Sequence, residues 1–157
     1  ALQRAAHFRR PRITERLVAA AANVNICNRF RESPLHIAAR KGCTETMKAL
    51  LEAGGDPEAL TLTGRSPLHL GVIHNRSDGV GLLLDAGVNT EGRELDSGQT
   101  PLSKAAEFGF VDIIDLLLGK GANIESKSGA GVNPLQWSCR SNHPDSVAVL
   151  LSAGADP

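Results

Sequence analysis

A short motif that recurs at a fixed interval is the feature that most constrains how this chain can fold. A proline-leucine pair, preceded each time by serine, threonine or asparagine, occurs at intervals of 33, 34 and 33 residues. The prolines are Pro34, Pro67, Pro101 and Pro134. A second marker, two leucines with a glycine three residues after the second, keeps the same phase and ends at Gly54, Gly87, Gly121 and Gly154. Two markers in phase predict stacked repeats instead of one globular core.

Each repeat predicts two short helices. The residue before each proline is a favourable N-cap, and proline is accepted in the first helical turn because its missing N–H is not needed there. About eight residues later stand glycine or asparagine, which best tolerate the left-handed backbone that closes a helix. These residues are Gly42, Asn75, Gly109 and Asn142. A second helix with an apolar face follows and ends near the next glycine, and the remaining turn-forming residues predict a hairpin-like loop.

This pattern resembles the ankyrin repeat family, whose period is 33 residues and whose T-P-L-H-x-A signature is best matched by residues 33–39. The resemblance implies an all-α repeat solenoid of helix-turn-helix pairs joined by hairpin-like loops. It covers the whole chain as a single domain of five repeats, at about 1–24, 25–57, 58–91, 92–124 and 125–157. The first repeat is degenerate, and Pro11 falls at the expected start of its second helix, as Pro144 does in the fifth. Ser103 and Gln136 replace the signature histidine.

Composition excludes several classes of protein. The strongly apolar runs, such as residues 82–84, fall far short of the roughly 20 residues that cross a bilayer, so no membrane insertion is expected. Cys27, Cys43 and Cys139 are odd in number and widely separated, which fits neither a disulfide framework nor a zinc site. An intracellular, reducing location, cytoplasmic or nuclear, is therefore expected. Cys43 and Cys139 are expected to be small buried residues, and Trp137 a core residue more than an exposed anchor.

No catalytic residue, metal site or cofactor is expected. The five histidines include no pair at the i, i+4 spacing of a helical metal site, and no nucleophile, base and orienting group can be recognised together. The resemblance implies that His36 and His69 bond to the neighbouring loop. Five arginines lie between Arg4 and Arg16 and could contact phosphates, but the chain has no tyrosine and only 3% aromatic residues, so nucleic-acid binding is the weaker hypothesis.

The resemblance instead implies a non-catalytic module, monomeric as an isolated domain, that binds a partner protein or peptide segment in a concave groove. The groove would be lined by the hairpin tips and the exposed flank of each first helix. By position, these residues are Arg29, Phe30, Glu32, Arg40, Lys41, Leu62, Thr63, Arg65, Ile73, His74, Asp96, Gln99, Glu107, Phe108 and Arg140. Four of them are apolar where the repeat alone would allow polar residues, as is typical of interface hot spots: Phe30, Leu62, Ile73 and Phe108.

Charge is unevenly distributed although the net charge is zero, because residues 1–78 carry 12 basic and 7 acidic side chains and residues 79–157 carry 5 and 10. An acidic partner is therefore expected near Arg29, Arg40, Lys41 and Arg65, and a basic one near Asp96 and Glu107. Two alternatives remain open at this point. The chain could be a regulatory or targeting domain of a larger enzyme or channel, or a structural spacer.

Overall fold

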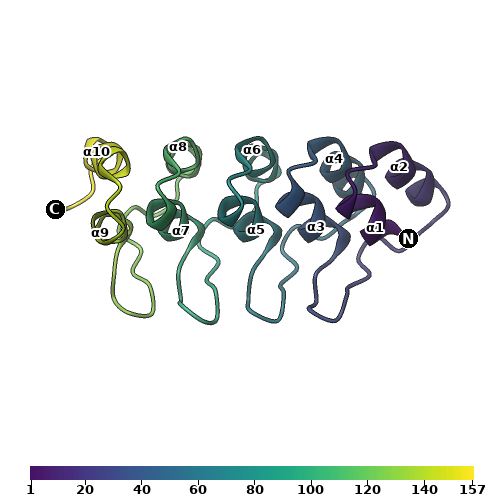
Figure 1. Cartoon of the computed structure of the whole chain (residues 1–157), viewed down its shortest axis with the longest axis horizontal. Helices are drawn as coiled ribbons and strands as arrows, with labels where there is room; N and C mark the ends of the chain where they lie inside the picture. Colours follow the sequence, from purple (N-terminus) through teal and green to yellow (C-terminus); the bar gives the residue numbers. More distant parts are fainter. The chain divides into compact units, whose positions relative to one another are not determined.

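The computed structural model describes all residues, Ala1–Pro157, as ten α-helices and no strand. The all-α repeat fold predicted from the sequence is confirmed, with the helices in five pairs (Figure 1). The chain divides into two compact units, residues 1–88 and 89–157. None of the helices is long and apolar enough to cross a membrane.

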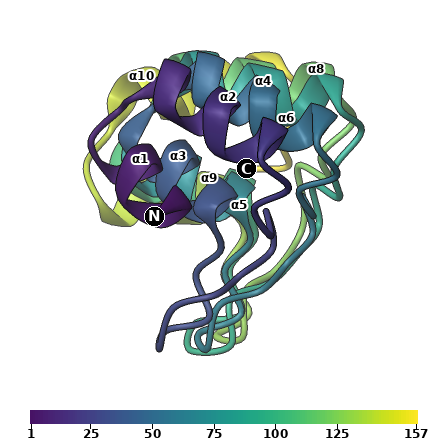
Figure 2. The ribbon, with the colours of Figure 1, turned by 90° about the vertical axis from the view of Figure 1, so that its right-hand side faces the viewer.

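The first unit contains three helix pairs. They are α1 (Leu2–His7) with α2 (Pro11–Ala19), α3 (Pro34–Lys41) with α4 (Thr44–Glu52), and α5 (Pro67–Ile73) with α6 (Ser77–Asp85). Helix α3 packs against α1 on one side and α5 on the other, and α4 packs between α2 and α6 in the same way. The first helices therefore form one layer and the second helices another, and the hairpin loops project beyond the first-helix layer (Figures 1 and 2).

The second unit contains two helix pairs built on the same plan. They are α7 (Pro101–Phe108) with α8 (Val111–Gly119), and α9 (Pro134–Arg140) with α10 (Pro144–Ser152). Helix α7 packs against α9, and α8 packs against α10. In both units the core consists of fully buried leucines and isoleucines at matching repeat positions, such as Leu68 and Leu102, each contributing about 1.5–3 kcal/mol by its removal from water.

Each first helix of repeats two to five begins at a capped proline, as predicted. The Ser33 side chain accepts a hydrogen bond from the backbone N–H of His36, and Nδ1 of His36 accepts one from the Ser33 N–H at 3.1 Å. In the fifth repeat, Gln136 replaces the histidine and its Oε1 accepts the N–H of Asn133 at 3.2 Å. Reciprocal capping therefore survives the change of residue type.

The turns between paired helices also follow the sequence prediction. Gly42 and Gly109 have φ of 67° and 75°, and Asn75 and Asn142 have φ of 52° and 58°, so all four close their turns in the left-handed region.

The hairpin loops explain the single interval of 34 residues. Three loops are closed by a backbone hydrogen bond between residues four apart, for example from the Thr61 N–H to the Arg65 carbonyl at 3.0 Å. The loop before α7 is closed instead between residues five apart, from the Glu94 N–H to the Gln99 carbonyl, also at 3.0 Å. The additional residue is therefore accommodated at the tip of this hairpin.

Two expectations about buried residues need correction. Cys43 is buried as expected, but Cys139 is exposed and lines an open apolar cavity of about 510 Å³ with Val147 and Leu151. Ala39, at the same repeat position, is buried because α5 packs against α3, whereas α9 is covered by α7 on its other side only. Trp137 is half-buried, with the guanidinium of Arg140 5.6 Å from its ring centroid, and does not belong to the core.

Candidate functional site

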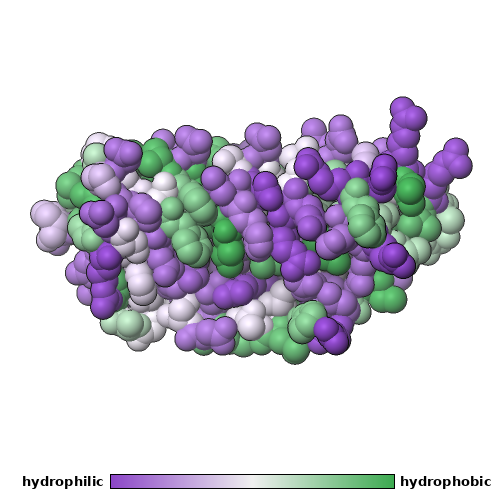
Figure 3. Space-filling view, viewed as in Figure 1, coloured by the Kyte–Doolittle hydropathy of each residue, from purple (hydrophilic) through white to green (hydrophobic).

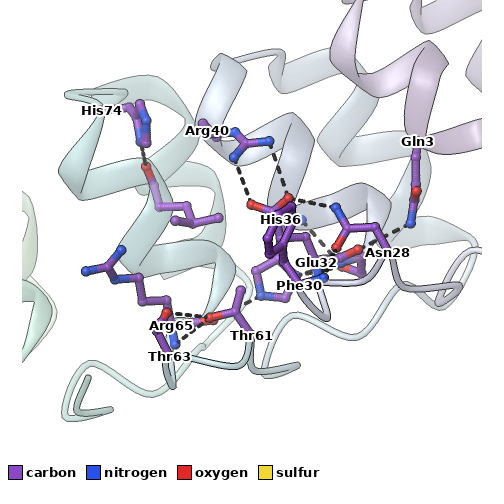
Figure 4. A network of polar contacts seen from close by, with 12 residues as sticks. Gln3, Asn28, Phe30, Glu32, His36, Arg40, Thr61, Thr63, Arg65 and His74 are labelled. Atoms are coloured by element: carbon purple, nitrogen blue, oxygen red, sulfur yellow. Dashed lines mark hydrogen bonds and ion pairs between the residues drawn. The ribbon is translucent and has the colours of Figure 1, made fainter. Parts of the chain in front are cut away.

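An open groove of about 700 Å³ lies on the first unit, between the first-helix layer and the hairpin loops. Its lining comes from α1, from the loops before α3 and α5, and from α3 and α5 themselves. The predicted residues that line it are Phe30, Glu32, Arg40, Leu62, Thr63, Arg65 and His74. Figure 4 labels all of these except Leu62. Three other predicted residues, Arg29, Lys41 and Ile73, are not part of the lining.

Side-chain hydrogen bonds shape the first loop tip of this unit, and a backbone hydrogen bond joins it to the second tip. Oδ1 of Asn28 accepts the N–H of Phe30 at 2.9 Å and that of Glu32 at 3.0 Å, which shapes the first tip. The Leu62 N–H donates to the Phe30 carbonyl at 3.1 Å and joins the second tip to the first. The loops therefore present Phe30 and Leu62, with 51% and 58% of their surface exposed, from a fixed backbone.

Glu32 does not project from its loop tip as the repeat position suggested, since only 8% of its surface is exposed. Its Oε1 lies 2.8 Å from Nη1 of Arg40, and its Oε2 accepts Nδ2 of Asn28 at 2.8 Å (Figure 4). The carboxylate thus fixes the loop to helix α3 and neutralises the charge of Arg40. Glu32 and Arg40 therefore act mainly by shaping the groove.

His36 lies beneath this groove and connects consecutive repeats. Its Nε2 donates to the carbonyl of Arg65 at 3.1 Å, while Nδ1 accepts from Ser33, an arrangement that defines the neutral tautomer. Burial lowers the pKa of His36, although the Arg65 carbonyl and the Glu32 carboxylate act in the opposite direction. The bond between the signature histidine and the neighbouring loop, implied by the family resemblance, is therefore present.

The charged lining of the groove is predominantly basic. It contains three arginines, Arg4, Arg40 and Arg65, and a single carboxylate, that of Glu32, which is paired with Arg40. His7 and His74 also belong to the lining. Just outside the lining, the guanidinium of Arg29 lies 4.7 Å from the ring centroid of Phe30.

The second unit carries a smaller polar cluster on α7 and the loop before it. Nζ of Lys104 lies 3.0 Å from Oε2 of Glu107 and 3.6 Å from Oε2 of Glu94. Gln99 donates through Nε2 to the same Glu107 oxygen at 2.9 Å and is 1% exposed, so it too lies inside the loop instead of at an exposed tip. Phe108, Asp96 and Arg140 remain at the surface, as expected.

Sequence reasoning missed several groove residues in α1 and at its C-cap. Arg4, His7 and Phe8 line the groove, and Phe8 is as exposed as Leu62. Phe8 occupies the repeat position of Lys41, His74 and Phe108, so extending the register of predicted binding positions back into the first repeat would have found it. Gln3 was also missed. Its Nε2 donates to the Glu32 carbonyl at 3.3 Å, as His36 donates to that of Arg65 one repeat later.

On the face shown in Figure 3, hydrophobic patches lie among hydrophilic ones. Leu95, at the lengthened hairpin tip of the second unit, is the most exposed of the large apolar residues at 74%, and its position was not predicted. No three histidine, cysteine, aspartate or glutamate side chains gather closely enough to hold a metal ion.

A family comparison agrees with the geometry of the repeats. The family model described as ankyrin repeats (3 copies) matches residues 2–93 and 88–157. The nuclear factor NF-kappa-B p105 subunit of Gallus gallus is 34% identical in an alignment of length 149 that covers 92% of this chain and 15% of that protein. Human neurogenic locus notch homolog protein 1 is 30% identical over 132 residues, 84% of this chain and 5% of that protein. The chain therefore spans 15% or less of the length of these relatives.

Proposed function

Because this chain belongs to the ankyrin repeat family, a family of protein–protein interaction modules, we propose that it binds a segment of a partner protein and catalyses no reaction. The groove of the first unit is the proposed contact surface. The observation that carries this proposal is the pair of half-exposed apolar side chains, Phe30 and Leu62, on loop tips that a backbone hydrogen bond holds together.

The physical basis of the proposal is preorganisation. An exposed aromatic or aliphatic anchor surrounded by charged groups is the usual composition of an interface hot spot. When the loop that carries the anchor is already ordered, association does not have to supply that ordering free energy. The Asn28 and Glu32 side chains fix the first tip through hydrogen bonds to the loop itself and to α3, so little of the binding free energy is consumed in shaping the surface.

The remaining predicted residues are proposed to make further contacts, each within its own unit. On the second unit these are Asp96, Phe108 and Arg140, which are exposed, and Gln99 and Glu107 would act by positioning Lys104 and the loop. Arg29, Lys41 and Ile73 would contact a partner at the edge of the first-unit groove. Specific complexes bury about 1,600 Å² in total, which exceeds what two anchors provide and requires such flanking contacts.

The proposal is tested by comparing Leu62→Ser with Leu60→Ser. Leu60 is 48% exposed, two residues away on the same loop, and does not line the groove, so it controls for loss of an exposed leucine. Tagged chains are used for affinity capture from cells with quantitative mass spectrometry, and captured proteins are then remeasured with purified components. Direct binding retained by Leu60→Ser and lost by Leu62→Ser supports the proposal. Equal binding by both variants contradicts it.

We propose in addition that the chain acts as a monomer in a reducing, intracellular compartment. The three cysteines are unpaired, and their number and spacing support this location.

A further inference from the structure

We propose that the first-unit groove selects an acidic, apolar segment of its partner. The segment would place a large apolar side chain against Phe30 and Leu62 and a carboxylate toward Arg4 and His7. This inference rests on the proposed function and adds to it the chemistry of the partner.

The first step concerns charge. Glu32, the one carboxylate of the lining, is buried and already satisfied by Arg40 and Asn28, at 2.8 Å from each. The ion pair of Glu32 and Arg40 therefore contributes little net charge to the groove. Arg4 and His7 are exposed on α1, and because Arg4 and Arg65 have no carboxylate to balance them within the lining, an approaching carboxylate meets a net positive lining. Like-charge contacts reject basic segments, so electrostatic complementarity provides selectivity as well as faster association.

The second step concerns shape and hydrophobicity. Ile37 and Leu70 line the groove and are 5% exposed, so they form an apolar floor between the exposed walls of Phe30, Leu62 and Phe8. A leucine or phenylalanine from a partner would remove apolar surface from water on both sides of the contact. Burying such a side chain is worth about 1.5–3 kcal/mol. The groove therefore combines an apolar binding surface with neighbouring cationic side chains.

The third step separates a protein segment from a nucleic acid, which is also acidic. Base recognition by aromatic residues needs an open ring face for stacking. One face of Phe30 is occupied by the Arg29 guanidinium 4.7 Å from its centroid, and Phe8 meets His7 edge to face at 5.0 Å. These contacts reduce the ring surface that is open to stacked bases, whereas an aliphatic side chain can pack at the ring edges. The observations therefore favour a peptide.

The experiment uses the whole chain and three fluorescent peptides of equal length, which alternate leucine and phenylalanine with glutamate, glutamine or lysine. We expect the glutamate peptide to bind by fluorescence anisotropy, the glutamine peptide to bind about tenfold more weakly, and the lysine peptide not to bind. Affinity for the glutamate peptide should fall as salt is raised, because salt screens exposed charges. A single-stranded oligonucleotide is the fourth probe.

Two matched pairs of variants locate the interaction. Arg4→Glu should lower the affinity for the glutamate peptide about tenfold. Arg12→Glu changes an exposed arginine of the same repeat that lies outside the groove, and it should have little effect on this affinity. Arg4→Gln provides the same test with a smaller change of charge. Leu62→Ser should abolish binding and Leu60→Ser should not. The circular dichroism spectrum of each variant is compared with that of the parent chain to check that the variant is folded.

The outcomes separate this inference from the function on which it rests. Equal affinities for the glutamate and glutamine peptides, both lost in Leu62→Ser, would overturn the acidic preference and leave segment binding intact. No binding of the glutamate peptide, stronger binding of the lysine peptide, or stronger binding of the oligonucleotide would also overturn the inference. The partner-capture comparison of Leu62→Ser with Leu60→Ser then decides the proposed function independently.

Discussion

Nε2 of His36 lies 3.1 Å from the carbonyl oxygen of Arg65, and this bond joins the start of α3 to the hairpin loop of the next repeat. The imidazole serves two elements at once, because its Nδ1 also accepts the N–H of Ser33. Only the second bond requires the neutral ring, because a protonated Nδ1 cannot accept, whereas Nε2 donates to the Arg65 carbonyl in either state. Protonation of this buried side chain therefore breaks the cap at Ser33 and leaves the link between repeats in place.

Stability should fall as the pH drops below about 6.5, partly because of His36. Burial lowers its pKa in the folded protein, so the unfolded chain, where the pKa lies near 6.5, binds the proton more readily. The contribution of His36 is complete above this pH and is lost as the pH falls through the window below it. Urea denaturation at a series of pH values from neutral to mildly acidic measures the effect.

His36→Gln is the matched control, because Gln136 already makes the reciprocal cap at this position of the fifth repeat. Glutamine does not titrate, so the free energy of unfolding of this variant should change less between neutral and acidic pH than that of the parent chain. Identical pH dependence in the two proteins would rule out His36 as a source of the acid sensitivity.

Arg31→Gly should stabilise the protein by up to about 1 kcal/mol. Arg31 has φ of 59°, at a loop position that Gly64, Gly98 and Gly131 occupy in the later repeats. A left-handed backbone costs a non-glycine residue about 1–2 kcal/mol, and the added flexibility of glycine in the unfolded chain offsets part of the gain. Arg29→Gly, where φ is not positive, should destabilise instead. The midpoint of thermal unfolding checks this prediction. A shift of the midpoint in the same direction for both variants would contradict this explanation.

Leu83→Ala should cost about 2–5 kcal/mol, because Leu83 is fully buried in α6 and truncation leaves a cavity. Leu82→Ala, next to it and half-buried, should cost clearly less. Chemical denaturation of the two variants compares them directly. A loss below about 1 kcal/mol for Leu83 would mean that the apolar face of the second helix has been assigned to the wrong residues.

The local features of the fold were predictable because their signals are local. A capping residue before Pro34 or Pro134 fixes a helix start, and a glycine or asparagine at Gly42 or Asn142 fixes its end, whatever packs around it. Capping by Gln136 follows from the same rule, since an amide can accept a backbone N–H as imidazole does. These signals occur four times, in repeats two to five.

The candidate site was less predictable because it depends on contacts between elements. Nothing in the repeat pattern shows that Glu32 turns inward to Arg40, so reversing Arg40, as the sequence-based charge hypothesis would suggest, removes an ion pair as well as a surface charge. Cys139 is exposed because burial at that position requires a neighbouring helix. Leu95 is exposed in the hairpin that has one additional residue. The longer interval between prolines reveals the additional residue, but it does not reveal the geometry of the loop.

The close approach of two hairpin tips in the second unit yields a last prediction, which compares Gly98→Ala with Gly131→Ala. Both glycines have positive φ, 63° and 75°, so alanine is strained at either position by about 1–2 kcal/mol. At Gly98 a methyl group would also lie 2.6 Å from the backbone nitrogen of Gly129, which donates to the Ser97 carbonyl at 3.0 Å. At Gly131 it would meet nothing within 4 Å.

Gly98→Ala should therefore be the more destabilising change, because the methyl group forces the two tips apart and removes the hydrogen bond between them, in addition to the strain. Urea denaturation gives the two free energies of unfolding, and hydrogen exchange at the Gly129 amide should accelerate in Gly98→Ala and not in Gly131→Ala. Equal costs and an unchanged exchange rate would show that the contact between the tips contributes nothing to the stability of this unit.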